Sequence, residues 1–439
     1  MKRTMSKFLL PSLLGAFVAG DAFAAGFQLN EQNARATGRA SAVVATIDDP
    51  SAIWHNPAGL TRTKGTEFMA GLTLIVVDNG YTGPGLPSTN PNHPVDVDEV
   101  LSRGPTPVPH VYASHQLSER AWVGLGFYPS YGSGNDWEDP NNWAGRTQIE
   151  QIALRTFFFT PTVALKITDW ISVAVGLQLV PASVKLEQTL GDASGNVLFP
   201  RVSPDGQDGR LEVYGDAFGV GATAGITVDL IEHLQLGFAY RSSVDLSFEG
   251  EADFDLPPNV PAEVRANFPD QTGTAELTVP HTFLWGVGWN TESWVVDASV
   301  QLTLWDSYEE LRLNFDTGRP TPFTVSPRNW EVVPMFRLGG EYRLDQLALR
   351  AGVAYDVSPA PLETVEPGLP DGNRINVAAG AGYDFGPIRF DLAYMAVFLE
   401  GRDLDETNDE GEFINVFPLR GEFQGGVQHV IAATLGVRI

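Results

Sequence analysis

The 439-residue chain contains no cysteine, and this absence limits how it can be stabilised. A protein exported to an oxidising compartment without cysteine is not held together by disulfide bonds. Basic residues are also scarce, with 28 Lys and Arg against 54 Asp and Glu, which gives a formal charge of -26. Such a chain lacks the basic stripe that binding to nucleic acid or to an anionic membrane surface requires. We therefore expect no nucleic-acid partner.

Long apolar runs are missing as well. The N-terminus has Lys2, Arg3 and Lys7, then an apolar stretch over 8–19 and the small-residue signal AFA at 22–24. This order is typical of a secretory signal peptide that is removed, with an uncleaved anchor as the alternative. No later segment has 18 apolar residues in a row, so the mature chain is predicted to have no transmembrane helix. The mature protein is expected to be periplasmic, secreted or an outer-membrane barrel.

The motifs of enzymes are absent too. The chain has no G-x-S-x-G, HExxH or P-loop sequence, and its seven His residues are scattered without metal-site spacing. We expect no catalytic residue, no metal and no cofactor; an outer-membrane esterase or phospholipase, which needs a Ser–His pair, is the alternative. The acidic run DLDETNDEGE at 403–412 is expected to be a solvated loop, with a divalent-cation site as the alternative.

Apolar and polar residues instead alternate through much of the chain, as in 169–180, 234–241 and 388–398. In the last of these, Phe390 lies on an apolar face and Asp391 on the opposite, polar face. A period of two residues is typical of β-strands with one buried face. The sequence therefore predicts an all-β protein.

The period alone does not say which face is inside. A soluble sandwich places the apolar face in its core, whereas a membrane barrel turns that face toward lipid. Strands of about ten to twenty residues, against roughly five or six in soluble sheets, favour the barrel. Aromatic residues near strand ends favour it as well, because they form girdles at the membrane interfaces. These aromatic residues are Trp170, Trp289, Trp294, Tyr383 and Phe385.

The connections alternate strictly between short and long. Short turns are expected at 117–121, 167–170, 229–233, 290–293, 343–346 and 385–388. Long loops are expected at 79–105, 132–149, 190–210, 250–273, 314–328, 357–372 and 400–425. These thirteen connections predict a 14-stranded antiparallel transmembrane β-barrel with both ends of the sheet on the short-turn side, as in bacterial outer-membrane proteins.

Residues 25–64 precede the first convincing strand and have a different character. They are rich in small residues, and Pro50 and Pro57 break both helices and strands. Irregular backbone at membrane depth is tolerated only where protein surrounds it, and a barrel of this size is wide enough to hold a plug. The predicted parts are a signal peptide at 1–24, an N-terminal plug or hatch inside the lumen at 25–64, and the barrel at 65–439.

Six short motifs follow one another along the mature chain. They are AGFQLNE at 25–31, GRA at 38–40, Asn56-Pro57-Ala58, YRSSVDLSFEG at 240–250, DVSPAP at 356–361 and LPDGNR at 369–374. In order and spacing they resemble the FadL family of outer-membrane transporters for long-chain fatty acids and other hydrophobic compounds, and Asn56-Pro57-Ala58 is similar to its NPA hatch motif. The C-terminal Ile439 departs from the aromatic residue with which many outer-membrane barrels end.

The resemblance implies a ligand pocket beside the hatch and a sideways exit. The implied pocket residues are Gly26, Phe27, Asn56, Pro57 and Ala58. The exit is implied at an inward kink of the third strand, with Pro129, Tyr131 and Gly132 at the lateral opening. Because Pro129 cannot donate to a sheet and Gly132 weakens strand pairing, a local gap is also expected on physical grounds; the alternative is that Pro129 only ends the strand.

An outer loop offers a candidate capture site. In the loop 250–273, Leu256, Val260, Val264 and Phe268 recur every four residues, which predicts a helical turn with an apolar stripe for a hydrophobic ligand. Packing of this loop on its neighbours is the alternative.

Charged residues are expected inside the barrel. We expect Arg241, Arg350 and Arg389 to pair with acids such as Asp356 and Asp391 in the lumen, with a carboxylate ligand as the alternative partner.

We expect a monomeric passive transporter in the outer membrane of a Gram-negative bacterium, surrounded by outer-membrane lipid. Its ligand is expected to be a hydrophobic small molecule such as a fatty acid, an aromatic hydrocarbon or an alkane. The alternative is a structural or adhesive barrel whose acidic loops are the functional part.

Overall fold

The computed structural model describes residues 26–77, 79–84, 96–100, 105–137, 143–192, 195–202 and 206–439. The expected signal peptide, residues 1–24, lies outside these described residues. None of the helices within them is long and apolar enough to cross a membrane.

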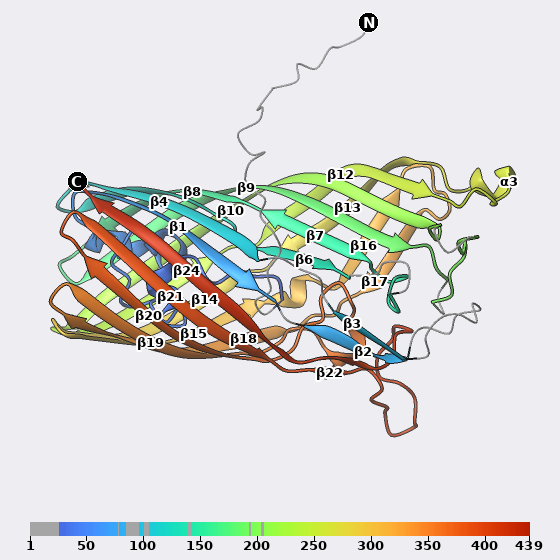
Figure 1. The fold of residues 1–439 in the computed structure, drawn as a ribbon. Helices are drawn as coiled ribbons and strands as arrows, with labels where there is room; N and C mark the ends of the chain where they lie inside the picture. Colours follow the sequence, from blue (N-terminus) through green and yellow to red (C-terminus); the bar gives the residue numbers. More distant parts are fainter. Residues whose placement is uncertain are drawn as a thin grey trace, which may run out of the picture.

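The described residues form a closed barrel of fourteen antiparallel strands, several of them built from two consecutive elements (Figure 1). The first seven are β1 (Thr66–Val76), β4 (Thr106–Ser118), β5 with β6 (Ala121–Tyr128, Gly132–Asp136), β7 with β8 (Gln151–Thr156, Phe158–Lys166), β9 (Ile171–Thr189), β10 (Arg210–Ile231), and β11 with β12 (Leu234–Arg241, Val244–Asp255). The other seven are β13 with β14 (Gln271–Val279, Thr282–Asn290), β15 with β16 (Trp294–Leu304, Glu310–Phe315), β17 with β18 (Phe323–Pro327, Val332–Leu344), β19 (Leu347–Asp356), β20 (Arg374–Asp384), β21 (Ile388–Leu399) and β24 (Gly426–Arg438). The barrel closes where β1 pairs with β24, for example Leu74 with Ile431.

The two faces of the wall have the polarity of a membrane protein. Phe390 and Leu392 of β21 are 43% and 49% exposed, whereas Asp391 between them is 2% exposed. Apolar side chains therefore point outward and polar side chains point into the lumen, which confirms the barrel and rejects the soluble sandwich. The five aromatic residues expected at strand ends are all exposed, at the end of the barrel with the short turns.

Four of the expected long loops contain strands, which corrects the sequence prediction: β6 lies in 132–149, β17 lies in 314–328, and the other two loops form a sheet of their own. The loops 79–105 and 400–425 contribute β2 (Gly80–Pro84), β3 (Asp96–Val100), β22 (Arg402–Asp403) and β23 (Glu422–Phe423), which form a separate four-stranded sheet. Tyr81 of β2 packs there against Phe423 and Trp143, with ring centroids 5.7 and 5.2 Å apart. The sequence predicts loops here because the segments are rich in acids and prolines, whereas only a few aromatic residues hold this sheet together.

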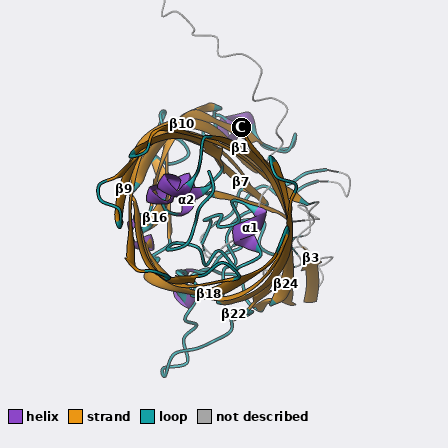
Figure 2. Cartoon of the chain, turned by 90° about the vertical axis from the view of Figure 1, so that its left-hand side faces the viewer, coloured by secondary structure: helices purple, strands orange, loops and turns teal. Residues whose placement is uncertain are grey.

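Residues 26–64, called the inner segment below, lie within the ring of strands (Figure 2). The inner segment contains α1 (Ala34–Thr37), α2 (Ala52–His55) and the 3-10 helix η2 (Pro57–Arg62). Helix α1 contacts β20, β21 and β24, whereas η2 contacts β5, β8, β9 and β10. The segment therefore bridges different parts of the wall, and nearly all of its side chains are buried. Of the remaining short helices, α3 (Ala262–Arg265) and η4 (Leu362–Thr364) lie in connections between barrel strands, and η3 (Trp305–Ser307) lies in the break between β15 and β16.

Candidate ligand-binding site and interrupted wall

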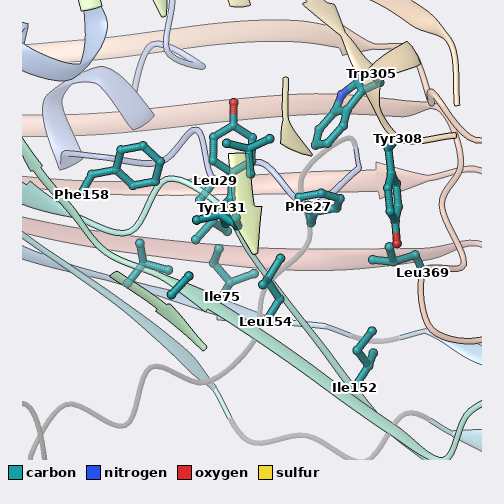
Figure 3. Close-up of a cluster of buried hydrophobic side chains, with 14 of the residues drawn as sticks. Phe27, Leu29, Ile75, Tyr131, Ile152, Leu154, Phe158, Trp305, Tyr308 and Leu369 are labelled. Carbon is teal, nitrogen blue, oxygen red and sulfur yellow. The ribbon is translucent and has the colours of Figure 1, made fainter. Parts of the chain in front are cut away.

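An aromatic cage surrounds Phe27 at the start of the inner segment (Figure 3). The ring of Phe27 lies 4.7 Å from Trp305, 5.7 Å from Tyr308 and Trp330, and 6.0 Å from Tyr131, measured between centroids. The preceding residue must be glycine. Gly26 has a φ of +62°, and a Cβ there would lie 2.6 Å from the ring of Trp305.

A hollow of about 800 Å³, part of it open to solvent, lies beside Phe27. Its walls are mostly apolar side chains from the outer half of the barrel. Examples are Ile152, Leu154, Leu186, Phe248, Leu313 and Leu369. A hollow with these apolar walls suits a hydrophobic small molecule.

The barrel wall is interrupted next to this cage. Pairing between β4 and β5 runs from Ser118 with Ala121 to Val111 with Phe127 and ends there. Beyond that point, no pairing joins residues 107–110 to the third barrel strand within the part of the chain that the structure describes. We call this interruption, in which 107–110 face 128–132, the seam.

The third strand turns inward at the seam and pairs with the inner segment. Leu29 N donates to Ser130 O at 2.9 Å, and Gly132 N donates to Phe27 O at 2.9 Å. Pro129 and Tyr131 are buried along with them. The structure therefore brings the expected pocket residues Gly26 and Phe27 together with the expected opening residues Pro129, Tyr131 and Gly132, which come from about 100 residues further along the chain.

The NPA motif lies elsewhere in the lumen, against β10. Asn56 donates its side-chain amide to Val44 O at 2.9 Å and to Ile226 O at 3.1 Å, and it accepts from Ala58 N at 3.3 Å. A side-chain amide thus satisfies backbone groups of this turn and also joins the turn to the backbone of β10. Gly225 of β10 leaves the room that Pro57 and Ala58 occupy.

The sequence predicts that this motif and Gly26 with Phe27 line one pocket, but no direct contact between the two parts is present among the described contacts. They connect the two parts through Trp54, whose indole N–H donates to Ser130 Oγ at 3.1 Å. Ser130 in turn is the residue with which Leu29 pairs.

Most of the expected lumenal ion pairs are present. Arg350 and Arg389 both contact Asp391, at 2.8 and 3.0 Å, and Asp356 lies 3.8 Å from Arg374. Opposite charges on nearby strands are therefore paired inside the lumen.

Arg241 departs from the expected pairing with an acid. It donates to Trp54 O at 2.8 Å, and its guanidinium carbon lies 4.3 Å from the Trp54 ring centroid. The side chain is 3% exposed, yet Nε and Nη2 have no hydrogen-bond partner among the described residues. The charged or titratable neighbours that act on Arg241 are Tyr131, Tyr128 and Tyr112, and no acid is among them in the part of the chain that the structure describes. A buried cation of this kind is available to an anionic ligand.

The expected capture stripe is only partly present. The four-residue helix α3 forms in this loop, and Val264 on it is 37% exposed. Leu256 is buried, and Val260 and Phe268 are partly buried against the core. A single exposed stripe would need a longer helix, because residues outside α3 do not follow its period of 3.6.

Several residues at the site were missed by the sequence analysis. Trp305, Tyr308 and Trp330 lie in irregular breaks between consecutive barrel elements, where no period identifies a partner. Their aromatic character at such breaks is the signal in the sequence that could have identified them. Among the described residues, no group of three or more His, Asp or Glu side chains is arranged to hold a metal ion.

Known proteins share this architecture. The family model described as "Outer membrane protein transport protein (OMPP1/FadL/TodX)" matches residues 15–437. The long-chain fatty acid transport protein of Salmonella typhi is 28% identical over 391 residues, which cover 84% of this chain and 86% of that protein. A Pseudomonas aeruginosa FadL homologue aligns with a TM-score of 0.77 at 21% identity, covering 94% of this chain and 99% of the other. The Pseudomonas putida toluene transporter TodX aligns with a TM-score of 0.69 at 18% identity, with the same coverage. The chain therefore belongs to the OMPP1/FadL/TodX family of transport proteins, not to a family of enzymes, and resides in the outer membrane of a Gram-negative bacterium.

Proposed function

We propose that the protein carries long-chain fatty acids, or amphiphiles of the same build, across the outer membrane by passive diffusion. The observation that carries this proposal is the buried guanidinium of Arg241, which has no acid partner among the described residues and two nitrogens without a hydrogen bond, together with the apolar hollow at Phe27. Tyr131 joins the two, since it lies against Phe27 and within electrostatic reach of Arg241. An apolar tail fits the hollow, and a carboxylate fits a buried cation that lacks an acid.

The proposed route has three stages. Ligand is captured at the outer loops beside Val260 and Phe268, and its tail enters the hollow at Phe27. The inner segment then acts as a hatch: Leu29 separates from Ser130, and the ligand leaves sideways through the seam into the membrane. No cofactor or energy source is required, because the ligand moves toward the side where it is consumed.

The relatives suggest two kinds of ligand, and Arg241 distinguishes them. The Salmonella typhi relative is named for long-chain fatty acids and TodX for toluene. A neutral hydrocarbon gains nothing from a guanidinium, whereas a carboxylate gains a charge-assisted hydrogen bond that contributes ~1.5–3 kcal/mol. The unpaired cation therefore favours the fatty acid.

The test is uptake of radiolabelled oleate and of toluene by cells that lack their own transporter. Cells with the wild-type protein are expected to take up oleate well above cells with an empty vector. Arg241→Met keeps a long side chain on Trp54 but removes the charge, and is expected to slow oleate uptake about ten-fold while leaving toluene uptake unchanged.

Arg312→Met is the matched control, because this residue is exposed and paired with Glu310 on the outer wall. Oleate uptake no faster than with the empty vector would contradict the proposal and favour the adhesive or structural barrel. Equal loss of oleate and toluene uptake in Arg241→Met would instead show that Arg241 only supports the fold.

A further inference from the structure

The second barrel strand, β4, presents alternate residues to its two neighbours. Gln116 N donates to Gly65 O at 2.8 Å, on the β1 side. Hydrogen-bonding direction alternates along an antiparallel strand, and β4 keeps one register with β1. His110 therefore directs its backbone groups toward β1, while Val111 and the other odd-numbered residues direct theirs toward the third strand.

The two odd-numbered residues beyond Val111 are both proline. Pairing with the third strand stops at Val111, and the next positions that face it are Pro109 and Pro107. A proline has no N–H to donate to a neighbouring strand, and within sheets it is confined to edges, strand ends and bulges. This side of the seam consequently presents carbonyl groups but no donors.

The opposite side of the seam is satisfied in a different way. Ser130 O and Gly132 N are paired with the inner segment, and Pro129 O accepts from the side chain of Gln32 at 2.6 Å. The third strand therefore forms its hydrogen bonds with the inner segment inside the lumen. At the seam, β4 offers no backbone N–H that could pair with the third strand instead. Both sides can face each other without a backbone ladder between them.

The prolines lie at the depth of the lipid-facing band. Pro109 is opposite Leu72, which is 41% exposed on the outer face. Pro107 is opposite Leu74, which in turn pairs with Ile431, 45% exposed. An unpaired backbone N–H at this depth is strongly unfavourable, because lipid offers no acceptor. Proline is the residue that allows a free sheet edge there without an unpaired donor.

We propose that Pro107 and Pro109 are positioning residues that keep the seam free of backbone pairing, so that it parts to let ligand through. The proposal rests on the lateral release described above and adds the residues of β4 that make it possible. Opening the seam therefore breaks no backbone hydrogen bond between β4 and the third strand, and the backbone pairs to be released are those of the third strand with the inner segment.

The test restores the two donors with the double variant Pro107→Ala/Pro109→Ala. The new amides are expected to pair with the third strand and to be protected from hydrogen exchange in the purified protein. Oleate uptake by cells is expected to fall about ten-fold, since the seam then has a ladder to break. Oleate binding to the purified protein should stay within about two-fold of wild type, because the hollow is untouched.

Pro334→Ala is the matched control, since Pro334 lies in the paired wall opposite Leu302 and should leave uptake unchanged. If the double variant does not reach the outer membrane, the single variants Pro107→Ala and Pro109→Ala are each expected to show an intermediate loss. Wild-type uptake by the double variant, unprotected new amides, or an equal loss in Pro334→Ala would each overturn the proposal. Failure of the wild-type protein to take up oleate would instead overturn the proposed function itself.

Discussion

Arg35 of α1 and Glu341 of β18 form a bidentate ion pair inside the barrel. Arg35 Nε lies 3.1 Å from Glu341 Oε2, and Nη2 lies 3.2 Å from Oε1. Glu341 is 1% exposed, and its carboxylate also accepts hydrogen bonds from Arg350 Nε at 2.7 Å and Arg343 Nε at 2.8 Å. This carboxylate is therefore the point at which the inner segment and the wall share one charge network.

The first prediction concerns Glu341→Gln. Removing one partner of a buried ion pair is expected to cost ~3–5 kcal/mol, because the cations around it remain buried. We expect α1 to detach from the wall, with faster hydrogen exchange over residues 33–62 and larger conductance in planar bilayers. Glu310→Gln is the control, since its pair with Arg312 is 41% exposed on both sides and such pairs contribute ~0–1 kcal/mol. Unchanged exchange in Glu341→Gln would show that the network does not hold the inner segment.

The second prediction concerns Asn56→Ala. The variant loses two donated hydrogen bonds and leaves Val44 O without this donor, at a cost of ~1–3 kcal/mol. That is too little to unfold a closed barrel but enough to loosen the turn. We expect a heat-modifiable barrel in the outer membrane with reduced oleate uptake. Uptake at the wild-type rate, at equal protein level, would make the motif scaffolding only.

The third prediction tests the same turn from the wall. In Gly225→Ala the new Cβ would lie 2.8 Å from Pro57 Cδ and 3.0 Å from Ala58 N, so the turn has to shift. We expect this variant to reproduce the uptake loss of Asn56→Ala. In the control Gly436→Ala the nearest atoms are 3.9 Å away, and wild-type uptake is expected. A wild-type rate in Gly225→Ala would argue against close packing of the turn on β10.

The fourth prediction concerns Phe27→Ala, measured by oleate binding to the purified protein. The ring lines the hollow and is 1% exposed, and its loss leaves a cavity among Trp305, Tyr308 and Trp330. We expect binding at least about ten-fold weaker, from the lost apolar contact. Phe398→Ala, which removes a ring that is 48% exposed on the lipid face, should bind as wild type does. Equal binding by both variants would place the ligand elsewhere.

The fifth prediction is a dependence on pH through His55. Burial in α2, reinforced by the nearby charge of Arg241, lowers the pKa of His55 well below its usual range. An opened inner segment would take up a proton below about pH 6.5, whereas the closed one does not. Closure is therefore expected to weaken as the pH falls below about 6.5 and to be independent of this group above it.

Hydrogen exchange of the α2 amides at pH 5 and pH 7.5, corrected for intrinsic rates, measures this dependence. His55→Gln is expected to remove it, and His115→Gln, on the exposed face of β4, is expected to keep it. The same pH dependence in His55→Gln as in wild type would assign it to another group.

The fold could be predicted because the barrel strands repeat the same alternation of apolar and polar residues. Alternation such as that around Asp391 marks a wall with two unlike faces, and the short turns mark one end of it. The site could be predicted only where a residue type such as proline marks a turn or a break in strand pairing, as at Pro129. The partners of those residues could not, because Trp305 and Asp371 reach Gly26 from strands and loops nearly 300 residues or more away. Such contacts depend on the closed barrel, and no local pattern encodes them.

The charged residues of the lumen could likewise be predicted only in part from the sequence. The sequence predicted that Arg350 and Arg389 pair with lumenal acids such as Asp391, and both do. Nothing in the sequence separates these arginines from Arg241, which faces Trp54 and tyrosines rather than an acid. Its neighbours come from the inner segment and the kinked third strand, so its isolation follows from the fold.

The small sheet formed by the loops 79–105 and 400–425 continues the junction of β1 and β24 beyond the barrel. Tyr81 pairs with Phe423, and Gln424 N donates to Gly80 O at 2.9 Å. Both junctions join the beginning of the barrel to its end, so neither can form until synthesis of the whole chain is complete. A prematurely terminated product would keep two open edges, one in the bilayer and one above it, and would be a ready substrate for the proteases that clear unassembled envelope proteins.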